Sequence, residues 1–292
     1  MEFVRGILLA LVMIWTGHAS ATDIAEAVQF SSADMAKTEI GGLVVKPAGP
    51  GPFPGVVMLH GCAGLTTKSG KLRKRPMFWS KWLAARGYLV LMTDSFGPRG
   101  HGSICSVKNR PVRPDKERPF DAYGALRYLQ GRGDVRADNV ALMGWSNGAM
   151  ALLWAIKSPA EWRPSNLRHD FRAAIGFYPG CTKISKTPHY VTKIPTALLL
   201  GELDDWTPAK PCLRFAATAA ARSSPIHATL YEGAYHNFDH PTAKVKTVLT
   251  RNSESKRSER RVHSGGNADA RRAAIDAVDA LLKQHAPSAQ DQ

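Results

Sequence analysis

The chain has 292 residues, a formal net charge of +15 at pH 7 and hydrophobic residues at 44% of its positions. This length is sufficient for one large domain with a buried core, and no break in composition marks a second domain. Basic residues cluster at 68–75, 108–118 and 244–261, a distribution that attracts anions. No nucleic-acid-binding motif or interleaved aromatic residues accompany these clusters, so we expect no nucleic-acid partner.

The first 21 residues have the pattern of a secretory signal peptide. Arg5 precedes an apolar run from Gly6 to Trp15, and residues 19–21 form the cleavage pattern Ala-Ser-Ala. The run is too short for a stable transmembrane helix, and no later stretch is long and apolar enough to cross a membrane. An uncleaved anchor fits less well because the cleavage site is so well placed. We therefore predict removal of residues 1–21 and one exported domain over 22–292, periplasmic or secreted.

Apolar runs and helical periodicities alternate along the mature chain. Residues 37–46 have the alternating pattern of an edge strand. Buried strands are predicted at 55–59, 88–93, 140–144, 173–178, 196–200 and 228–231, and helices at 74–86, 120–130, 147–157, 211–222 and 268–285. This alternation is typical of an α/β fold whose mostly parallel central sheet has helices on both faces. The polar, basic segment 241–267 is expected to be a flexible insert within the domain.

The sequence Gly144-Trp-Ser146-Asn-Gly148 lies where an apolar strand turns into a helix. G-x-S-x-G in this context is the nucleophile elbow, in which a sharp turn exposes the serine hydroxyl. The turn holds Ser146 in a strained backbone conformation, and a side chain at either glycine would collide across it. The alternative interpretation is a glycine-rich turn with an incidental serine.

A nucleophilic serine needs a base to take its proton and an acid to orient that base. In elbow-containing folds the chain order is serine, acid, histidine, each just beyond a strand. Asp204 or Asp205 follows one later strand, and His236 follows the last. We favour Asp204 because the acid in such loops usually lies four residues before a proline, here Pro208. Asp205 is the alternative, or a cap for the following turn.

His60, His240 and seven other histidines compete with His236 for the role of base. His60 and His240 are less well placed than His236, which directly follows the last strand in the sequence Gly-Ala-Tyr-His-Asn-Phe. For His60, a structural role in bracing its loop by hydrogen bonding is the expected one.

The tetrahedral intermediate also needs hydrogen-bond donors for its oxyanion. One should be the backbone N–H of Asn147, directly after the nucleophile, and the other the Cys62 N–H in the loop His60-Gly-Cys-Ala-Gly64. Arg99 is a candidate for binding an anionic group on the substrate, or else it braces the long loop after it. Trp206 and Phe238 are candidate pocket walls, although packing roles are equally consistent with their positions.

Several motifs together resemble the dienelactone hydrolase family of α/β-hydrolases. They are His60-Gly-Cys-Ala-Gly64, Asp94-Ser-Phe-Gly-Pro-Arg-Gly100, Gly144-Trp-Ser-Asn-Gly148, Phe177-Tyr-Pro-Gly180, Gly201-Glu-Leu-Asp204 and Tyr231-Glu-Gly-Ala-Tyr-His236. The resemblance covers residues 37–240 and the final helix, and it implies an α/β-hydrolase sheet, no cofactor, and hydrolysis of small esters or lactones. The name-giving enzymes use a cysteine nucleophile, whereas this chain has Ser146, which favours a broader serine carboxylesterase.

Four cysteines in an exported chain favour disulfide bonds, and three pairings are possible. The hydrolase fold selects Cys62–Cys105 and Cys181–Cys212, because the two members of each pair follow successive strands and all four lie at the catalytic edge of the sheet. Cys62 as a nucleophile is a poor alternative, since its loop lacks the geometry of the elbow. The chain has no C-x-x-C pair, so we expect no zinc site.

These observations favour a serine hydrolase that forms an acyl-enzyme on a small ester or lactone. An acyltransferase with the same triad is the first alternative, and an exported, non-catalytic anion-binding protein is the second. Substrate specificity depends on loops 95–119 and 158–170, whose shapes the sequence does not predict.

Overall fold

The computed structural model describes residues 25–159, 161–250 and 260–291. The predicted signal peptide therefore lies outside the described residues. Within these ranges, no helix combines the length and apolar character needed to cross a bilayer.

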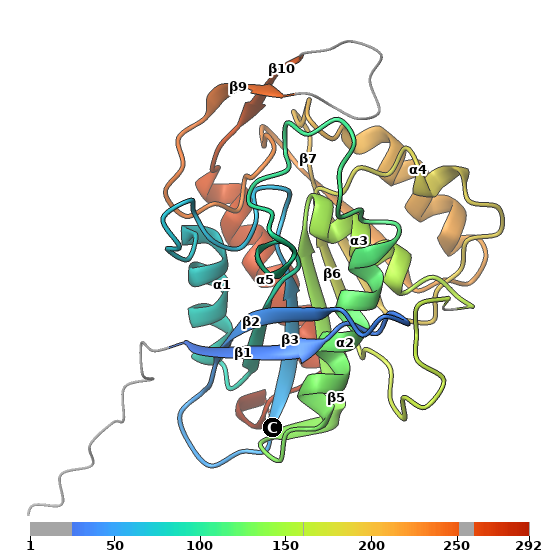
Figure 1. The fold of residues 1–292 in the computed structure, drawn as a ribbon. Helices are drawn as coiled ribbons and strands as arrows, with labels where there is room; N and C mark the ends of the chain where they lie inside the picture. Colours follow the sequence, from blue (N-terminus) through green and yellow to red (C-terminus); the bar gives the residue numbers. More distant parts are fainter. Residues whose placement is uncertain (1–24, 160, 251–259, 292) are drawn as a thin grey trace, which may run out of the picture.

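An eight-stranded sheet forms the centre of the molecule, in the order β1-β2-β4-β3-β5-β6-β7-β8 (Figure 1). Its strands are β1 (Glu26–Ser31), β2 (Glu39–Val45), β3 (Phe53–Leu59), β4 (Leu89–Asp94), β5 (Val135–Trp145), β6 (Ala174–Phe177), β7 (Thr196–Gly201) and β8 (Ile226–Tyr231). The first two strands pair antiparallel and β2 pairs antiparallel with β4, while β4 through β8 are parallel. The strand predicted at 37–46 is present as β2, but β1 covers its outer side, so β2 is not the edge.

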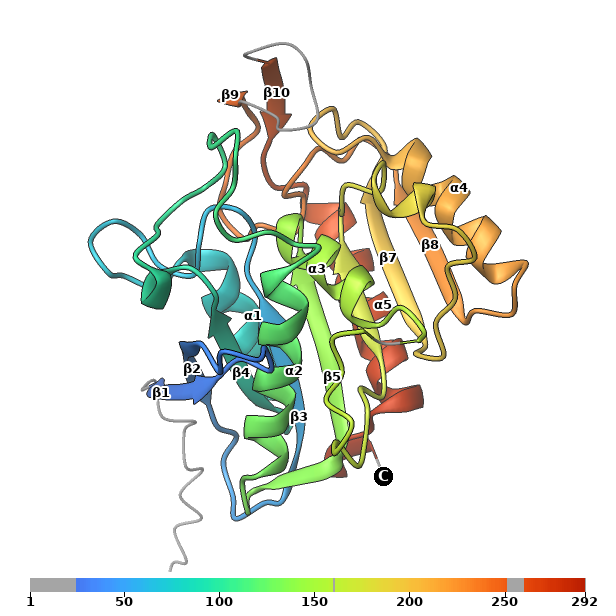
Figure 2. The same ribbon diagram turned by 45° about the vertical axis from the view of Figure 1, so that its right-hand side comes forward.

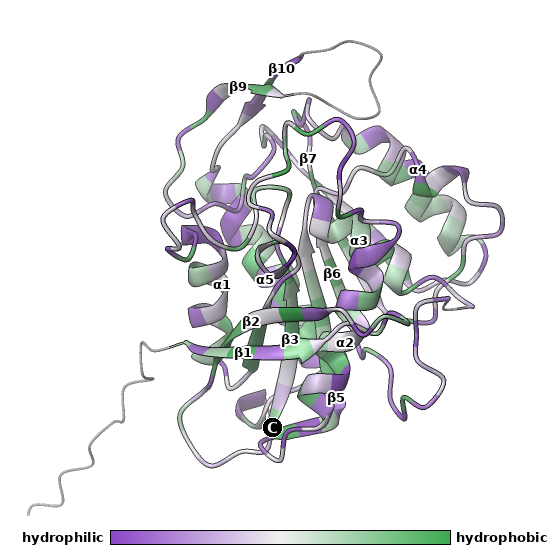
Figure 3. Cartoon of the chain, in the orientation of Figure 1, coloured by the Kyte–Doolittle hydropathy of each residue, from purple (hydrophilic) through white to green (hydrophobic). Residues whose placement is uncertain are grey.

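Helices cover both faces of this sheet, as Figure 2 shows. On one face, α1 (Lys74–Ala84) and α5 (Ala268–His285) contribute buried apolar residues to one hydrophobic cluster. On the other face, α2 (Glu117–Gln130), α3 (Asn147–Ala155) and α4 (Ala209–Ala220) contribute to a second cluster. The central strands carry hydrophobic residues on both sides of the sheet, because both sides are covered (Figure 3). The predicted α/β-hydrolase architecture is confirmed.

The described part of the chain also contains three short 3₁₀ segments, at Gly97–Arg99, Ile184–Lys186 and Ala289–Asp291.

The parallel strands all end at the same edge of the sheet, so the loops that follow them meet there. This edge carries the candidate site.

The basic segment 241–267 contains a two-stranded antiparallel hairpin, β9 (Lys246–Thr250) with β10 (Arg260–Ser264). A backbone bridge between His236 and Ser264 joins the hairpin to the loop after β8. The hairpin is therefore attached to the edge where the strands end. The two strands were not predicted from the sequence pattern.

Candidate active site

Ser146 occupies the turn between β5 and α3 with φ 49° and ψ −113°, a conformation that costs free energy for a residue other than glycine. A Cβ atom on Gly144 would lie 2.7 Å from the carbonyl carbon of Gly148. A Cβ atom on Gly148 would lie 2.1 Å from the carbonyl oxygen of Leu59, at the end of β3. Both glycines are therefore required for the turn to close, which confirms the steric reason predicted for them.

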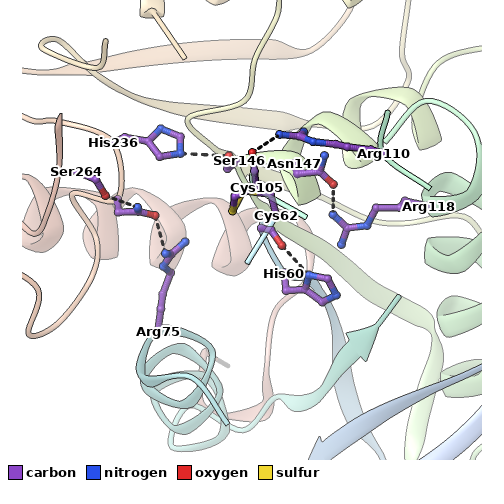
Figure 4. Close-up of a disulfide and its surroundings, with 12 residues drawn as sticks. His60, Cys62, Arg75, Cys105, Arg110, Arg118, Ser146, Asn147, His236 and Ser264 are labelled. Carbon is purple, nitrogen blue, oxygen red and sulfur yellow. Dashed lines mark hydrogen bonds between the residues drawn. A yellow bond between two sulfur atoms is a disulfide. The ribbon is translucent and has the colours of Figure 1, made fainter. Parts of the chain in front are cut away.

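A chain of hydrogen bonds connects Ser146, His236 and Asp204. The Ser146 hydroxyl lies 3.1 Å from His236 Nε2 (Figure 4), and His236 Nδ1 lies 2.7 Å from Asp204 Oδ2. A carboxylate can only accept, so Nδ1 donates to Asp204 and Nε2 is left to accept from the serine hydroxyl. His236 and Asp204 are both almost completely buried. This is the arrangement in which a histidine can remove a proton from serine.

Asp204 is itself held in place by the turn that follows β7. Its Oδ1 accepts hydrogen bonds from the backbone N–H groups of Trp206 (2.9 Å) and Thr207 (2.8 Å). The Thr207 hydroxyl lies 3.0 Å from Asp204 Oδ2 and 3.0 Å from His236 Nδ1. Asp204 therefore has one oxygen that caps the turn and one that faces the histidine.

Asp205 points to a different histidine. Its carboxylate accepts from the backbone N–H of His263 and lies 2.8 Å from His263 Nδ1, on β10. The suggested role of Asp205 as a cap for the following turn is wrong, because Asp204 makes those bonds. The structure brings Asp204, and not Asp205, to His236.

The loop after β3 lies beside the serine. A Cβ atom on Gly61 would be 3.7 Å from the Ser146 Cβ, in van der Waals contact, which places this loop against the elbow. His60 braces this loop: its Nε2 accepts from the Ser95 N–H (3.2 Å), which leaves Nδ1 to donate to Gly61 O (2.8 Å). Burial, and then the charge of Arg118, lowers the pKa of His60. A neutral imidazole fits both of these hydrogen bonds.

Both predicted disulfide bonds are confirmed. Cys62 pairs with Cys105, and Cys181 pairs with Cys212, at Cα–Cα distances of 4.8 and 5.0 Å. The first bond joins the loop after β3 to the long loop after β4, and the Ile104 N–H also donates to Cys62 O (2.8 Å). Backbone bonding and a covalent bond therefore both fix the segment that carries Cys62.

A cavity of about 540 Å³ opens above Ser146 and His236. Cys62, Cys105 and Trp206 line it, and the indole ring of Trp206 lies 4.9 Å from the imidazole of His236. The lining contains no aspartate or glutamate, and its five lysine and arginine residues are Lys71, Arg73, Lys74, Arg75 and Lys246. Burial, and then the charge of Arg75, lowers the pKa of Arg73. Residues 71–75, which run into the first turn of α1, therefore give this wall of the cavity a positive charge.

Two candidate substrate-binding residues lie elsewhere. Arg99 donates to both carboxylate oxygens of Asp121 and to Ser95 O, each at 2.8 Å, so its guanidinium is used in bracing the loop. Phe238 is fully buried and packs against Phe177, Tyr178 and Tyr231 in the core. Neither residue lines the cavity, whereas Trp206 does. The contacts of Arg99 therefore fit its alternative role of bracing the loop, and those of Phe238 fit a packing role in the core.

Asp239 was missed by sequence reasoning. This fully buried carboxylate accepts hydrogen bonds from the indole N–H groups of Trp79 (2.8 Å) and Trp145 (2.7 Å) and from the Tyr178 hydroxyl. It thereby links the loop of His236 to the residue that precedes the nucleophile. The one feature of the sequence that could have indicated a role for Asp239 is its position three residues after His236, the predicted base.

Among the described residues, no group of three or more His, Cys, Asp or Glu side chains could hold a metal ion.

Residues 40–286 match the model of the dienelactone hydrolase family. The chain belongs to the dienelactone hydrolase family. A probable 2-oxo-3-(5-oxofuran-2-ylidene)propanoate lactonase from a Bradyrhizobium species is 22% identical over 208 residues, which are 67% of this chain and 77% of that protein. The match and this relative identify the chain as a hydrolase of ester or lactone bonds.

Two solved structures share the fold at low sequence identity. A putative dienelactone hydrolase from Klebsiella pneumoniae is 14% identical, with a TM-score of 0.61 over 90% of this chain and 100% of that one. Esterase 2 of Thermogutta terrifontis, in a form phosphonylated by cyclosarin, is 16% identical, with a TM-score of 0.61 over 89% of this chain and 94% of that one. These likenesses extend over nearly the whole sheet and its helices.

Proposed function

We propose that this member of the family is a serine hydrolase that cleaves small carboxylic esters or lactones through an acyl-enzyme. Ser146 is the nucleophile, His236 the general base and Asp204 the residue that orients and stabilises the base. The observation that carries the proposal is the buried hydrogen-bond chain from Ser146 through His236 to Asp204. No other acid or base is needed for the reaction.

The reaction proceeds by two similar transfers. The Ser146 oxygen bonds to the substrate carbonyl carbon while its proton passes to His236 Nε2, and the carbonyl π electrons move onto oxygen. When the carbonyl re-forms, the bond to the alcohol oxygen breaks and the leaving oxygen takes the proton from His236. A water molecule repeats both steps on the acyl-enzyme, which releases the carboxylic acid and restores the Ser146 hydroxyl.

The oxyanion of each tetrahedral intermediate is stabilised by the backbone N–H groups of Asn147 and Cys62. Asn147 directly follows the nucleophile and begins α3, where backbone N–H groups point outward without helical partners. Cys62 lines the cavity beside Ser146 and is fixed by its disulfide bond. Donors held in place before the reaction stabilise charge without a cost of reorganisation.

The preferred substrates carry a negative charge near the scissile bond. No acidic residue lines the cavity beside these cations, and of the five only Arg75 has a carboxylate within ion-pair distance among the described residues, the buried Asp239 at 3.8 Å, so the wall keeps a net positive field. The lactonase relative is named for a propanoate, which is an anionic substrate of that protein. We also propose that the protein acts after export, which its two disulfide bonds support because such bonds persist in oxidising compartments.

Hydrolysis of p-nitrophenyl acetate and butyrate, together with labelling by a fluorophosphonate, tests the proposal. Ser146→Ala should abolish both signals, whereas Ser185→Ala, at an exposed position in the loop after β6, should leave both unchanged. Undiminished ester hydrolysis by Ser146→Ala would contradict the assignment of the nucleophile.

A further inference from the structure

Arg118 is a buried cation without a carboxylate partner. It lies at the start of α2, is fully buried, and forms no salt bridge with any of the described residues. Asp121, one turn along the same helix, is instead occupied by a bidentate pair with Arg99 and by a hydrogen bond from Ser32. Burial lowers the pKa of Arg118 to about 10, so the guanidinium is still charged at neutral pH. The charges of Asp121 and Asp94 favour this cation from a distance, but neither forms a salt bridge with it, and a buried charge without a direct ion pair is costly.

The hydrogen bond of Arg118 goes to the residue after the nucleophile. Its Nη1 donates to Asn147 Oδ1 at 2.7 Å, as Figure 4 shows, while its Nε and Nη2 have no partner among the described residues. A hydrogen bond from a charged donor is shorter and about twice as strong as one between neutral groups. Asn147 is also nearly completely buried, so water does not compete for this bond. The side chain of Asn147 therefore has one strongly preferred position.

Arg118 also lies behind the second donor loop. Its guanidinium is 5.2 Å from the ring centroid of Phe96, and Phe96 contacts His60 edge-on at a centroid distance of 4.4 Å. His60 in turn donates to Gly61 O, next to Cys62. Arg118 thus lies where supports for both proposed oxyanion donors come together.

We propose that Arg118 is a positioning residue of the hydrolytic centre, which acts by fixing Asn147 so that the N–H of that residue points at the oxyanion. The proposal rests on the serine-hydrolase function proposed above. It accounts for the retention of a buried guanidinium with no ion pair: a neutral side chain would fill the space but would hold Asn147 less stiffly. The contribution is made in the tetrahedral intermediates and the transition states that flank them, because negative charge develops on the oxygen there and not in the bound substrate.

Steady-state kinetics on p-nitrophenyl butyrate test this role with Arg118→Met, Asn147→Ala and the double variant. Arg118→Met should lower kcat by about tenfold to a hundredfold, the effect of a small misplacement of a catalytic group, and should leave KM within about twofold. Asn147→Ala keeps the backbone N–H yet should lower kcat similarly. Because both changes break the same contact, the double variant should be no slower than the slower single variant.

Arg127→Met is the matched control. Arg127 lies on the same helix, and its guanidinium donates to the carbonyl oxygens of Ser31 and Ser32, away from the elbow. Its loss should reduce thermal stability without the selective fall in kcat.

Three outcomes would overturn the inference: an unchanged kcat in folded Arg118→Met, multiplicative losses in the double variant, or a kcat in Asn147→Ala equal to that of the wild type. The last result decides the question even if Arg118→Met does not fold. Failure of the wild-type protein to hydrolyse any ester would instead reject the proposed function itself.

Discussion

Asp204→Asn is the most informative substitution in the candidate triad, because it changes the charge and the hydrogen bonding of the side chain but hardly its shape. Asp204 Oδ1 accepts from two backbone N–H groups, so the amide oxygen of asparagine should take that place. The amide NH₂ then faces His236 Nδ1 in the position of Oδ2, 2.7 Å away, where it can only donate. His236 is forced to carry its proton on Nε2, which can no longer accept from Ser146.

The size of the expected fall in kcat follows from the negative charge that Asp204→Asn removes. Two unit charges about 4 Å apart interact by about 4 kcal/mol at an effective dielectric constant of about 20. Each 1.4 kcal/mol corresponds to about tenfold in rate, so loss of the aspartate charge beside the imidazolium costs about 10³-fold. The wrong tautomer adds to this, and a total loss of about 10³- to 10⁴-fold in kcat is expected.

Asp205→Asn is the matched control, since it makes the same chemical change one residue away. Its carboxylate contacts His263 on the hairpin and not His236, so kcat should fall by no more than a few-fold. The assay is hydrolysis of p-nitrophenyl butyrate, with circular dichroism to confirm folding. Equal losses in the two variants, or a larger loss in Asp205→Asn, would refute the assignment of Asp204.

Three further predictions concern the disulfide bond, the cavity wall and acid stability. Replacing Cys62 and Cys105 by alanine should lower the free energy of unfolding by about 4 kcal/mol, a value that follows from their 43-residue separation and is measured by chemical denaturation. Ester kinetics should show that this change lowers kcat more than the same change at Cys181 and Cys212. Arg73→Gln should lower kcat/KM by about tenfold on a monoanionic ester, with little change on a neutral one, and an equal effect on both esters would contradict the role proposed for the basic wall. A hydrogen bond from Arg132 lowers the pKa of Asp134 to about 2, compared with about 4 in the unfolded chain. The Asp134 carboxylate therefore stabilises the fold fully at pH values above about 4, and this stabilisation is lost as the pH falls through about 2. The difference in Tm between the wild type and Asp134→Asn should accordingly be full at pH 6 and absent below pH 2.

The central strands and the elbow could be predicted from the sequence because their signals are local. A continuous apolar run such as 55–59 needs no partner to be recognised, and glycines at 144 and 148 are dictated by the turn itself. The predicted positions of Ser146, Asp204 and His236 therefore followed from local motifs and their order along the chain, whereas the disulfide pairing also required the fold that these motifs imply.

Features that depend on distant pairings could not be predicted in this way. β1 was missed because its polar, exposed side hides the alternation, and it is recognised only by its pairing with β2. Arg99 has an anion partner 22 residues away and Asp205 a histidine 58 residues away, and no local signal indicates which partner each selects. A single charged side chain in a loop carries no information about the direction in which it points.

The positive φ of Ser146 sets activity and stability against each other at one residue. Of all side chains, glycine would adopt this conformation most easily, so the hydroxyl at position 146 is maintained at a cost of about 1–3 kcal/mol to the folded state. A Ser146→Gly variant, which gives up the hydroxyl, should therefore be more stable than the wild type. The proposed serine-hydrolase function explains why serine stands where the backbone favours glycine, because only serine supplies the hydroxyl that the proposed reaction needs.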